Sequence, residues 1–439
     1  MNPPSQPDAI PLIAGDDDAL LLCGPQPLTR GEFRRRVAAL ARALPEAPFA
    51  INLCERRDHF IAAFCAAGLR GQTSLLPPSR APQAVAEVAA AHRGASRLVD
   101  GAADVDGFDV RVNGPLPAAA GQRVAPAALA MIAFTSGSTG TPSAHAKTWA
   151  ALAHTDAANQ HYLQAVCGGP AAIVATVPPQ HMYGMELSVL PPLLGGFSVH
   201  PGRPFFPQDV AAALAECPAP RLLVTTPVHL RALLESGVKL PPLAAMVTAT
   251  APLPVELAVA AEQRFDCELH EAFGATEVCI IAYRRTALTT RWQLLAGVEL
   301  TPAADGTEVR RPSLDTPVML ADIVELADDA RSFELRGRQA DLLEIAGKRA
   351  SLADLTRRLQ AVPGIRDGAM LQLDADASGV GRLVAVVVAD DGLADSAILA
   401  ALRQASDAVF LPRRIVRVDA LPRNETGKLP RSALLAMLD

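Results

Sequence analysis

Short apolar runs alternate with segments of helical periodicity along much of the chain. In residues 207–217, PQDVAAALAEC, apolar side chains recur at helical intervals. Near the start of residues 28–44, Thr29 and Glu32 have the spacing of a capping box. The apolar runs cover 128–134, 171–177, 221–226 and 244–249. Short buried strands separated by helices predict an α/β fold whose sheets are mainly parallel and flanked by helices.

The C-terminal part has a different pattern. The predicted elements are a helix over 351–362, strands over 369–373 and 382–389, a helix over 395–405 and a strand over 413–421. Ser351 and Asp354 open the first of these helices. This order predicts a small α+β domain. With the junction near 337–343, the chain divides into a large multi-lobed N-terminal domain, 1–338, and a small C-terminal domain, 339–439.

Composition narrows the class of protein. Half of the 439 residues are hydrophobic, which is ample for one large core and a smaller one. The net charge is −6, without the basic excess of a nucleic-acid binder, so no nucleic-acid partner is expected. Neither a signal peptide nor an apolar stretch long enough to span a bilayer is recognisable, so a cytoplasmic protein is expected.

The cysteines are scattered singly along the chain. Their positions are Cys23, Cys54, Cys65, Cys167, Cys217, Cys267 and Cys279. An odd number without paired spacing argues against both a disulfide framework and a zinc site.

A loop rich in small and hydroxyl residues follows the apolar run at 128–134. Its residues are Thr135, Ser136, Gly137, Ser138, Thr139 and Gly140. Glycines let the backbone approach a ligand closely, and hydroxyls and N–H groups after a strand can hold a phosphate. The Walker pattern is not met, because no lysine follows Gly140. On these residues alone, a phosphate loop and a plain Ser/Gly connector both stay open.

The segment TSGSTGTP resembles the phosphate loop of the adenylate-forming superfamily, which includes acyl- and aryl-CoA synthetases, nonribosomal adenylation domains and luciferases. The family usually has a lysine where this chain has Ser143, and Lys147 follows four residues later. The resemblance implies that the loop binds ATP and that Lys147 reaches the same phosphates.

The segment EAFGATE, residues 271–277, resembles the family's Tyr-Gly-x-Thr-Glu motif. The resemblance implies that Phe273 packs on adenine, with Gly274 beside it. It also implies that Thr276 contacts the α-phosphate and that Glu277 holds Mg²⁺, together with Thr139 of the loop. A hard cation prefers such oxygen ligands. Ala251 is assigned to the nucleotide as well.

Three further segments follow in family order. The resemblance implies that Asp322 binds the ribose, although the usual Thr-Gly before it is missing, and that Arg338 binds the nucleotide. LPRNETGKLPR, residues 421–431, is similar to the family's C-terminal motif, in which the lysine, here Lys428, stabilises the reacting carboxylate and phosphate.

In that family the small domain rotates between two half-reactions. The implied hinge is Ala340, where the family commonly has Asp or Lys. The implied thiol-transfer loop contains Gly347 and Lys348.

The segment PPQHMYG, residues 178–184, resembles the block before the family's acid pocket. His181 then lies beside the reacting carboxylate, as a second catalytic residue. The expected pocket is lined by His181, Tyr183, Thr225, Thr226 and Thr248. In MELSVLPPLL, residues 185–194, which follows HMYG, Glu186 is the only acid, which disfavours an amino acid and favours an aryl or short acyl acid.

The implied activity is an AMP-forming acid–thiol ligase. With ATP and Mg²⁺ it converts a carboxylic acid to an acyl-adenylate and pyrophosphate. It then passes the acyl group to the thiol of coenzyme A or of an acyl carrier protein. Three alternatives stay open: a degenerate nucleotide-binding member, suggested by Ser143 and Ala340; an amino-acid adenylation enzyme; and a phosphotransferase, whose usual motifs are missing.

Overall fold

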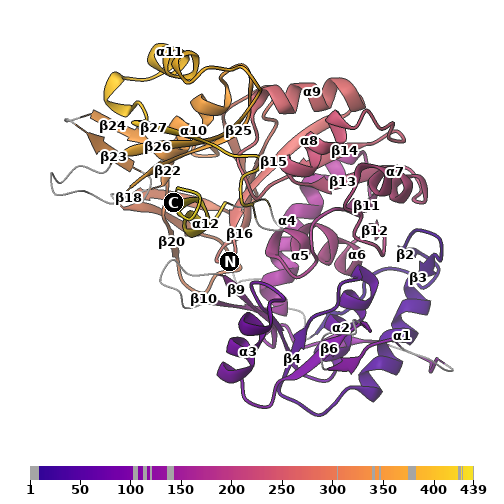
Figure 1. Ribbon diagram of the computed structural model, residues 1–439. Coiled ribbons are helices and arrows are strands. Elements are labelled where there is room, and N and C mark those ends of the chain that lie inside the picture. The colour runs from indigo at the N-terminus through magenta and orange to yellow at the C-terminus, as the bar shows by residue number, and fades with distance from the viewer. Residues whose placement is uncertain are drawn as a thin grey trace.

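The computed structural model describes most of the chain (Figure 1). The described part runs from residue 9 to residue 438, with internal gaps. The gaps are 102–106, 112–115, 119–120, 136–142, 304, 339–341, 346–347, 374–381, 424–426 and 428, and the side chains of 338, 342, 344, 345, 348 and 349 are also outside it. Within it, no helix combines the length and the apolar character needed to cross a bilayer.

One mixed sheet lies at the bottom of Figure 1. Its strands, in order, are β10 (Ser143–Thr148), β9 (Leu129–Thr135), β5 (Thr73–Leu76), β4 (Phe49–Asn52), β6 (Ser96–Val99) and β7 (Phe108–Asp109). All neighbours are parallel except β9 and β10. The apolar run at 128–134 is therefore a strand, as predicted. The predicted capping box is also present, because Thr29 and Glu32 exchange side-chain-to-backbone bonds at the start of α1 (Arg30–Ala43).

A longer sheet forms the centre of the molecule. Its described strands, in order, are β21 (Asp322–Leu326), β22 (Ser332–Arg338), β17 (Trp292–Leu294), β16 (Cys279–Arg284), β15 (Glu268–Ala275), β14 (Ala245–Thr248), β13 (Arg221–Thr225), β11 (Ala172–Ala175), β12 (Ser198–Val199), β2 (Leu20–Leu22) and β3 (Leu28–Thr29). The run from β15 to β2 is parallel, and the strands at both ends are antiparallel. The other three predicted strands all lie in the parallel run.

Helices cover both faces of this parallel run. Leu223 and Met246 belong to a core formed with α7 (Pro207–Ala215), α8 (Pro227–Glu235) and α9 (Val255–Phe265). The alternating residues Leu222, Val224 and Val247 belong to the largest core. The helices on that side are α4 (Trp149–Cys167), α5 (Met182–Ser188) and α6 (Leu190–Leu194). The α/β fold with covered parallel sheets is thus confirmed.

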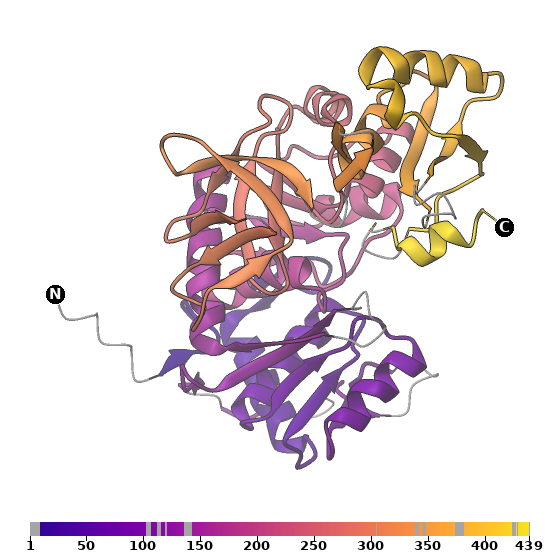
Figure 2. The same cartoon turned by 90° about the vertical axis from the view of Figure 1, so that its left-hand side faces the viewer.

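The C-terminal elements form a separate layer, drawn in yellow at the upper right of Figure 2. They are α10 (Leu352–Gln360), β25 (Ile365–Gln372), β26 (Leu383–Ala389), α11 (Asp395–Ala405), β27 (Arg414–Arg417) and α12 (Arg431–Leu435). Ser351 caps α10 as predicted, because its hydroxyl accepts from the amide of Asp354. The predicted order of elements is confirmed, whereas the boundary at 338/339 stays a prediction.

Three antiparallel strands, drawn in orange in Figure 2, pack next to β21. They are β18 (Glu299–Ala303), β19 (Gly306–Arg310) and β20 (Val318–Leu320).

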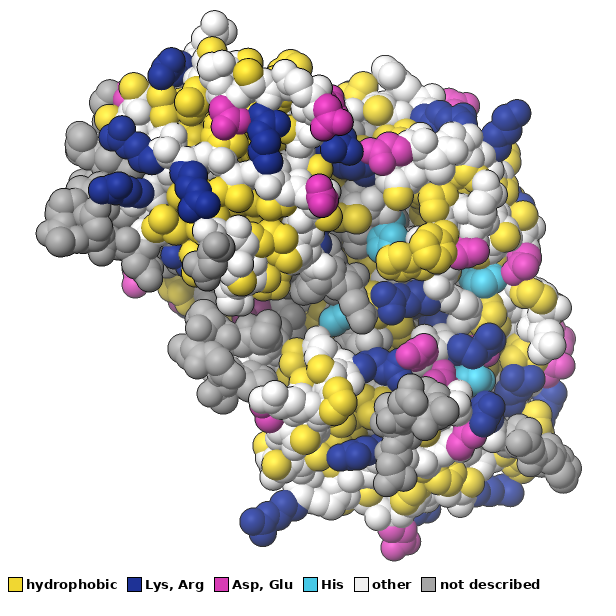
Figure 3. All heavy atoms as spheres, viewed as in Figure 1, with side chains coloured by type: hydrophobic (Ala, Val, Ile, Leu, Met, Phe, Trp, Pro, Cys, Tyr) yellow, Lys and Arg dark blue, Asp and Glu magenta, His cyan; other side chains and the backbone are white. Residues whose placement is uncertain are grey.

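On the face shown in Figure 3, the described Lys and Arg side chains are interspersed with Asp and Glu side chains and form no continuous basic surface.

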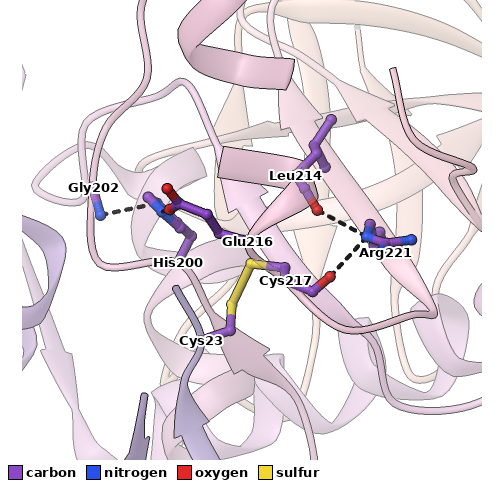
Figure 4. Close-up of a disulfide and its surroundings, with 7 residues drawn as sticks. All are labelled: Cys23, His200, Gly202, Leu214, Glu216, Cys217 and Arg221. Atoms are coloured by element: carbon purple, nitrogen blue, oxygen red, sulfur yellow. Dashed lines mark hydrogen bonds and ion pairs between the residues drawn. A yellow bond between two sulfur atoms is a disulfide. The ribbon is translucent and has the colours of Figure 1, made fainter. Parts of the chain in front are cut away.

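The cysteine spacing argues against a disulfide framework, yet two of the cysteines form one disulfide. Cys23, after β2, and Cys217, after α7, form a disulfide with a Cα–Cα distance of 5.3 Å (Figure 4). Their separation of 194 residues hides the pairing from any spacing argument. It arises because β2 joins the same parallel run that α7 covers.

Candidate active site

The phosphate-loop segment connects β9 to β10. These strands pair antiparallel, with Ser143 opposite Thr135, so the two strands on either side of the loop form a hairpin. Thr135 Oγ1 lies 3.2 Å from His145 Nε2 across the pair. The other loop residues assigned to the nucleotide lie outside the described part of the chain: Ser136, Gly137, Ser138, Thr139 and Gly140.

The Thr-Glu motif lies in the turn between β15 and β16. A β-carbon at Gly274 would lie 2.2 Å from the Cys279 carbonyl oxygen, so only glycine fits at this bulge. Thr276 and Glu277 follow in the turn, and the Glu277 carboxylate lies 4.0 Å from His145 Nε2. The fold therefore places the turn beside the phosphate-loop hairpin.

Phe273 lies in an aromatic cluster on the adjoining strands. Its ring centroid is 5.2 Å from that of Trp292 and 5.7 Å from that of Phe333. The side chain is half-buried, so part of the ring stays accessible. Its role toward adenine stays a prediction.

The segment HMYG forms the start of α5. His181 is the residue before the helix and is half-buried. The Tyr183 hydroxyl lies 3.0 Å from the Thr225 carbonyl oxygen and 2.9 Å from that of Val247, and burial raises the pKa of this tyrosine. Tyr183 therefore ties α5 to β13 and β14 instead of offering its hydroxyl to an open pocket.

Threonines gather at the carboxyl ends of β13 and β14, the edge where open α/β sheets bind ligands. Thr225 Oγ1 is 3.2 Å from Thr176 Oγ1, and Thr226 Oγ1 is 2.9 Å from His229 Nδ1. The hydroxyl of Thr248 is buried and has no hydrogen-bond partner among the described residues.

Thr250, which the sequence analysis missed, shares these features. Its hydroxyl is also buried without a partner in the described part of the chain, and its φ is +80°, which strains a β-branched residue. Ala251 follows it directly. No sequence signal marks this strain. Burial, followed by the charge of Arg203, lowers the pKa of His229, the partner of Thr226, to about 4, so its imidazole is neutral at pH 7.

Gly427 of the C-terminal motif lies near this threonine edge. Gly427 is buried, and a β-carbon there would lie 3.8 Å from Thr250 Oγ1 and 4.0 Å from Thr226 Oγ1. Arg423 anchors the motif, because its guanidinium holds both carboxylate oxygens of Asp367 at 2.8 and 2.9 Å and donates to the Gly427 carbonyl at 2.9 Å. Lys428 itself lies outside the described residues.

The remaining predicted residues are placed only in part. Asp322 is buried on β21, opposite Arg338 on β22, whose side chain is not described. Ala340 and Gly347 are outside the described part of the chain. Lys348 begins β24 (Lys348–Ser351), and its side chain is outside it as well.

Lys147, which the resemblance assigns to the nucleotide, and Glu186, the acid that follows HMYG, both make hydrogen bonds inside the protein. Lys147 is 6% exposed, and its ammonium donates to the Glu277 carbonyl at 2.5 Å. Glu186 is buried on α5 and accepts from the Ile280 amide, and burial raises its pKa to about 7. The assignment of Lys147 to the nucleotide stays a prediction that this geometry does not favour.

A protein-family model described as AMP-binding enzyme matches residues 13–331. The chain is 30% identical over 299 residues to 4-coumarate–CoA ligase from Rhodobacter capsulatus, covering 67% of this chain and 73% of the ligase. It is 26% identical over 368 residues to 3-hydroxybenzoate–CoA/4-hydroxybenzoate–CoA ligase from Thauera aromatica, covering 72% and 68%. The chain therefore belongs to the AMP-binding, adenylate-forming enzyme family.

The fold agrees with this membership. A solved structure of o-succinylbenzoate coenzyme A synthetase from Bacillus subtilis, in complex with ATP and magnesium ion, matches with a TM-score of 0.80 and 17% identity, covering 94% of this chain and 96% of that one. The share of a relative's length that this chain matches varies among the curated relatives. The chain spans 8% of isonitrile lipopeptide synthase from Streptomyces coeruleorubidus, to which it is 39% identical over 118 residues.

Proposed function

We propose that the chain activates an aryl or short acyl acid with ATP and then transfers the acyl group to a pantetheine thiol. In the first step a carboxylate oxygen bonds to the α-phosphorus of ATP, and pyrophosphate leaves. In the second, the thiol sulfur bonds to the carbonyl carbon, the thiol proton is released to solvent, and AMP leaves. The observation that carries the proposal is the position of Gly427, where an added β-carbon would lie within 4.0 Å of the hydroxyls of Thr226 and Thr250, at the ligand-binding edge of the sheet.

The residues divide by role around that edge. Lys428 follows Gly427 directly and would neutralise the charge that develops between carboxylate and phosphate. His181 would orient the acid, and the hydroxyl of Thr248, which lacks a partner in the described part of the chain, has a hydrogen bond to give to it. The loop 135–140 would bind the phosphates through hydroxyls and amides.

The candidate metal ligand fits magnesium. The Glu277 side chain is 39% exposed beside the hairpin that carries the loop, and the described residues contain no cluster of three or more metal-ligating side chains. Magnesium in nucleotide sites is commonly held by one or two carboxylates, with phosphates and waters completing the shell. A single carboxylate is therefore sufficient, and the bound cation would neutralise charge on the departing pyrophosphate.

The acid class is inferred from the site and from the named relatives. Glu186, the one acid in residues 185–194, is buried and accepts from the Ile280 amide, so it is not placed to pair with the ammonium group of an amino acid. Two relatives are named for coumarate and hydroxybenzoate. Both acids are aromatic, in keeping with a pocket of apolar residues and hydroxyls.

In the second step, a thiol accepts the acyl group from the acyl-adenylate in the same site. Coenzyme A and a carrier protein present the same thiol arm, and either is accommodated by the proposal. We assign 1–338 to the large domain and 339–439 to the small one, with rotation about Ala340 bringing Gly347 and Lys348 to the acceptor.

Pyrophosphate exchange tests the proposal. Aryl, short-chain, long-chain and amino acids are supplied with ATP, Mg²⁺ and labelled pyrophosphate, and return of label into ATP is measured. Exchange that depends on an aryl or short acyl acid is expected. Nucleotide binding without exchange for any acid would refute the ligase and favour a degenerate binding protein, whereas release of ADP would indicate a phosphotransferase.

A variant links the exchange to the C-terminal motif. Lys428→Ala is expected to reduce exchange by at least about 100-fold, the scale seen when one charge-stabilising donor is removed, and to leave transfer from supplied acyl-adenylate within a few-fold. Equal loss in both half-reactions would show that the lysine has another role.

A further inference from the structure

Buried charged side chains from three separate segments hold the turn that carries Glu277. The first is Lys147 on β10, whose ammonium donates to the Glu277 carbonyl oxygen at 2.5 Å. Lys147 is buried, so this contact is made inside the protein and not at its surface. The bond acts on the backbone of Glu277, while the carboxylate of the same residue stays partly exposed next to His145.

The second side chain is Glu186 on α5. Its two carboxylate oxygens lie 2.9 and 3.2 Å from the Ile280 amide, at the far end of the turn. Asn159 on α4 donates to the same carboxylate at 3.3 Å and in turn accepts from the Tyr283 hydroxyl at 3.0 Å. Glu186 therefore holds the start of β16 against two helices.

The third side chain is Arg311, which follows β19 and is 5% exposed. One of its guanidinium nitrogens donates to the Val278 carbonyl at 2.8 Å and to the Ile280 carbonyl at 2.9 Å. Between these two residues, Cys279 has a φ of +64°, a conformation that non-glycine residues rarely adopt. Such a conformation persists only where the surroundings impose it.

Three carbonyls and one amide between Glu277 and Ile280 are thus held by two buried cations and one buried carboxyl group. Burying charges is costly, and part of that cost is offset by the hydrogen bonds that these groups make to the turn, whose carbonyls and amide would otherwise lack these partners. What these side chains achieve is a fixed backbone from Glu277 to Ile280, so that the Glu277 carboxylate projects in one direction, beside the phosphate-loop hairpin.

We infer that Lys147, with Glu186 and Arg311, positions the Glu277 carboxylate for Mg²⁺·ATP and that Lys147 is not a phosphate ligand. The inference rests on the proposed function, since it takes Glu277 as the metal ligand. Lys147 acts through the peptide backbone and is a positioning residue. The lysine that is missing at Ser143 is then not replaced from position 147.

Nucleotide binding measured by calorimetry tests this without requiring turnover. The ligand is α,β-methylene-ATP, titrated with and without Mg²⁺, and AMP without Mg²⁺ is the reference. In the wild type, Mg²⁺ is expected to raise affinity for the analogue. Lys147→Met and Glu277→Gln are each expected to lower the affinity measured with Mg²⁺ about 10-fold, and to leave both affinities measured without Mg²⁺ within about twofold.

The double variant separates positioning from direct contact. If Lys147 acts through Glu277, combining the two substitutions lowers the affinity no further than about 10-fold, because the second change removes what the first had already lost. Losses that multiply to about 100-fold, or a loss by Lys147→Met that is equal with and without Mg²⁺, would overturn the inference and make the lysine a phosphate ligand. Lys239→Met, at an exposed lysine, is the matched control and should change nothing.

Arg311→Lys covers the case in which Lys147→Met does not fold. It keeps the positive charge and loses the guanidinium geometry, so a loss of about threefold, confined to the titration with Mg²⁺, is expected. Unchanged affinity in this variant would contradict the inference. If the wild type binds nucleotide but shows no pyrophosphate exchange, the proposed function is refuted while these binding comparisons stay valid. If the wild type binds nucleotide equally well with and without Mg²⁺, the inference is refuted.

Discussion

Replacing Glu186 with glutamine removes a buried carboxyl group whose ionisation opposes folding. Burial raises the pKa of Glu186 from 4.5 to about 7, even though Arg311 and Lys147 act in the opposite direction. The folded protein therefore keeps this proton to a higher pH than the unfolded chain does. The contribution of Glu186 to stability must then fall as pH rises from about 4.5 to about 7, and stay level above that range.

The magnitude follows from the two pKa values. Each tenfold change in the proton equilibrium is worth about 1.4 kcal/mol, so the difference between 4.5 and about 7 corresponds to about 3 kcal/mol. Most of it, about 2 to 3 kcal/mol, falls between pH 5 and pH 8. Glutamine keeps one oxygen for the Ile280 amide and carries no charge at any pH.

Urea unfolding of the wild type and Glu186→Gln at pH 5, 6, 7 and 8 measures the effect. The free energy of unfolding of the variant, relative to the wild type, is expected to rise by about 2 to 3 kcal/mol from pH 5 to pH 8. Asp156, whose pKa burial raises to about 8, adds its own pH dependence in both proteins, and the charge of Glu186, which also raises that pKa, is lost in the variant. Glu235→Gln, at an exposed site, is the control. Parallel curves for variant and wild type would refute the reasoning.

Three other substitutions test separate contacts. Arg423→Gln removes the ion pair with Asp367 that anchors the C-terminal motif, so pyrophosphate exchange should fall about 10-fold while transfer from supplied acyl-adenylate changes less than twofold; similar losses in both would argue against an anchor. Thr250→Gly relieves a φ of +80° and should raise the free energy of unfolding by about 1 kcal/mol in urea; a decrease would mean that lost contacts outweigh the strain. Cys23→Ser should lower the unfolding free energy of the oxidised protein by about 3 kcal/mol, and dithiothreitol should not change the unfolding free energy of this variant. A variant whose unfolding free energy still falls in dithiothreitol would indicate a different disulfide.

The candidate site could be predicted from the sequence where a motif lies in one continuous segment. The turn with Glu277 and the tail with Arg423 and Lys428 were found in this way, and the structure places Glu277 beside the hairpin and Gly427 on the threonine edge. Thr250 was missed because its strain depends on a backbone angle that no residue pattern reveals. Arg311 was missed because it stands in no motif and contacts the turn only through the fold.

The sequence by itself determined the local elements and their class. Apolar runs became parallel strands, Thr29 and Ser351 capped the helices that they were predicted to open, and the C-terminal order of helices and strands was correct. These outcomes depend on periodicity and on contacts within a few residues, which the sequence states directly.

Only the tertiary structure decided which distant residues meet and what their surroundings do to them. It joined Cys23 to Cys217, placed the ammonium of Lys147 on the Glu277 backbone and buried Glu186 deeply enough to raise its pKa. The physical reason is the same in each case. Strand order and packing set the distances between these residues and their exposure to solvent. The spacing of residues along the sequence therefore does not reveal which distant groups form hydrogen bonds or which charges lose contact with water.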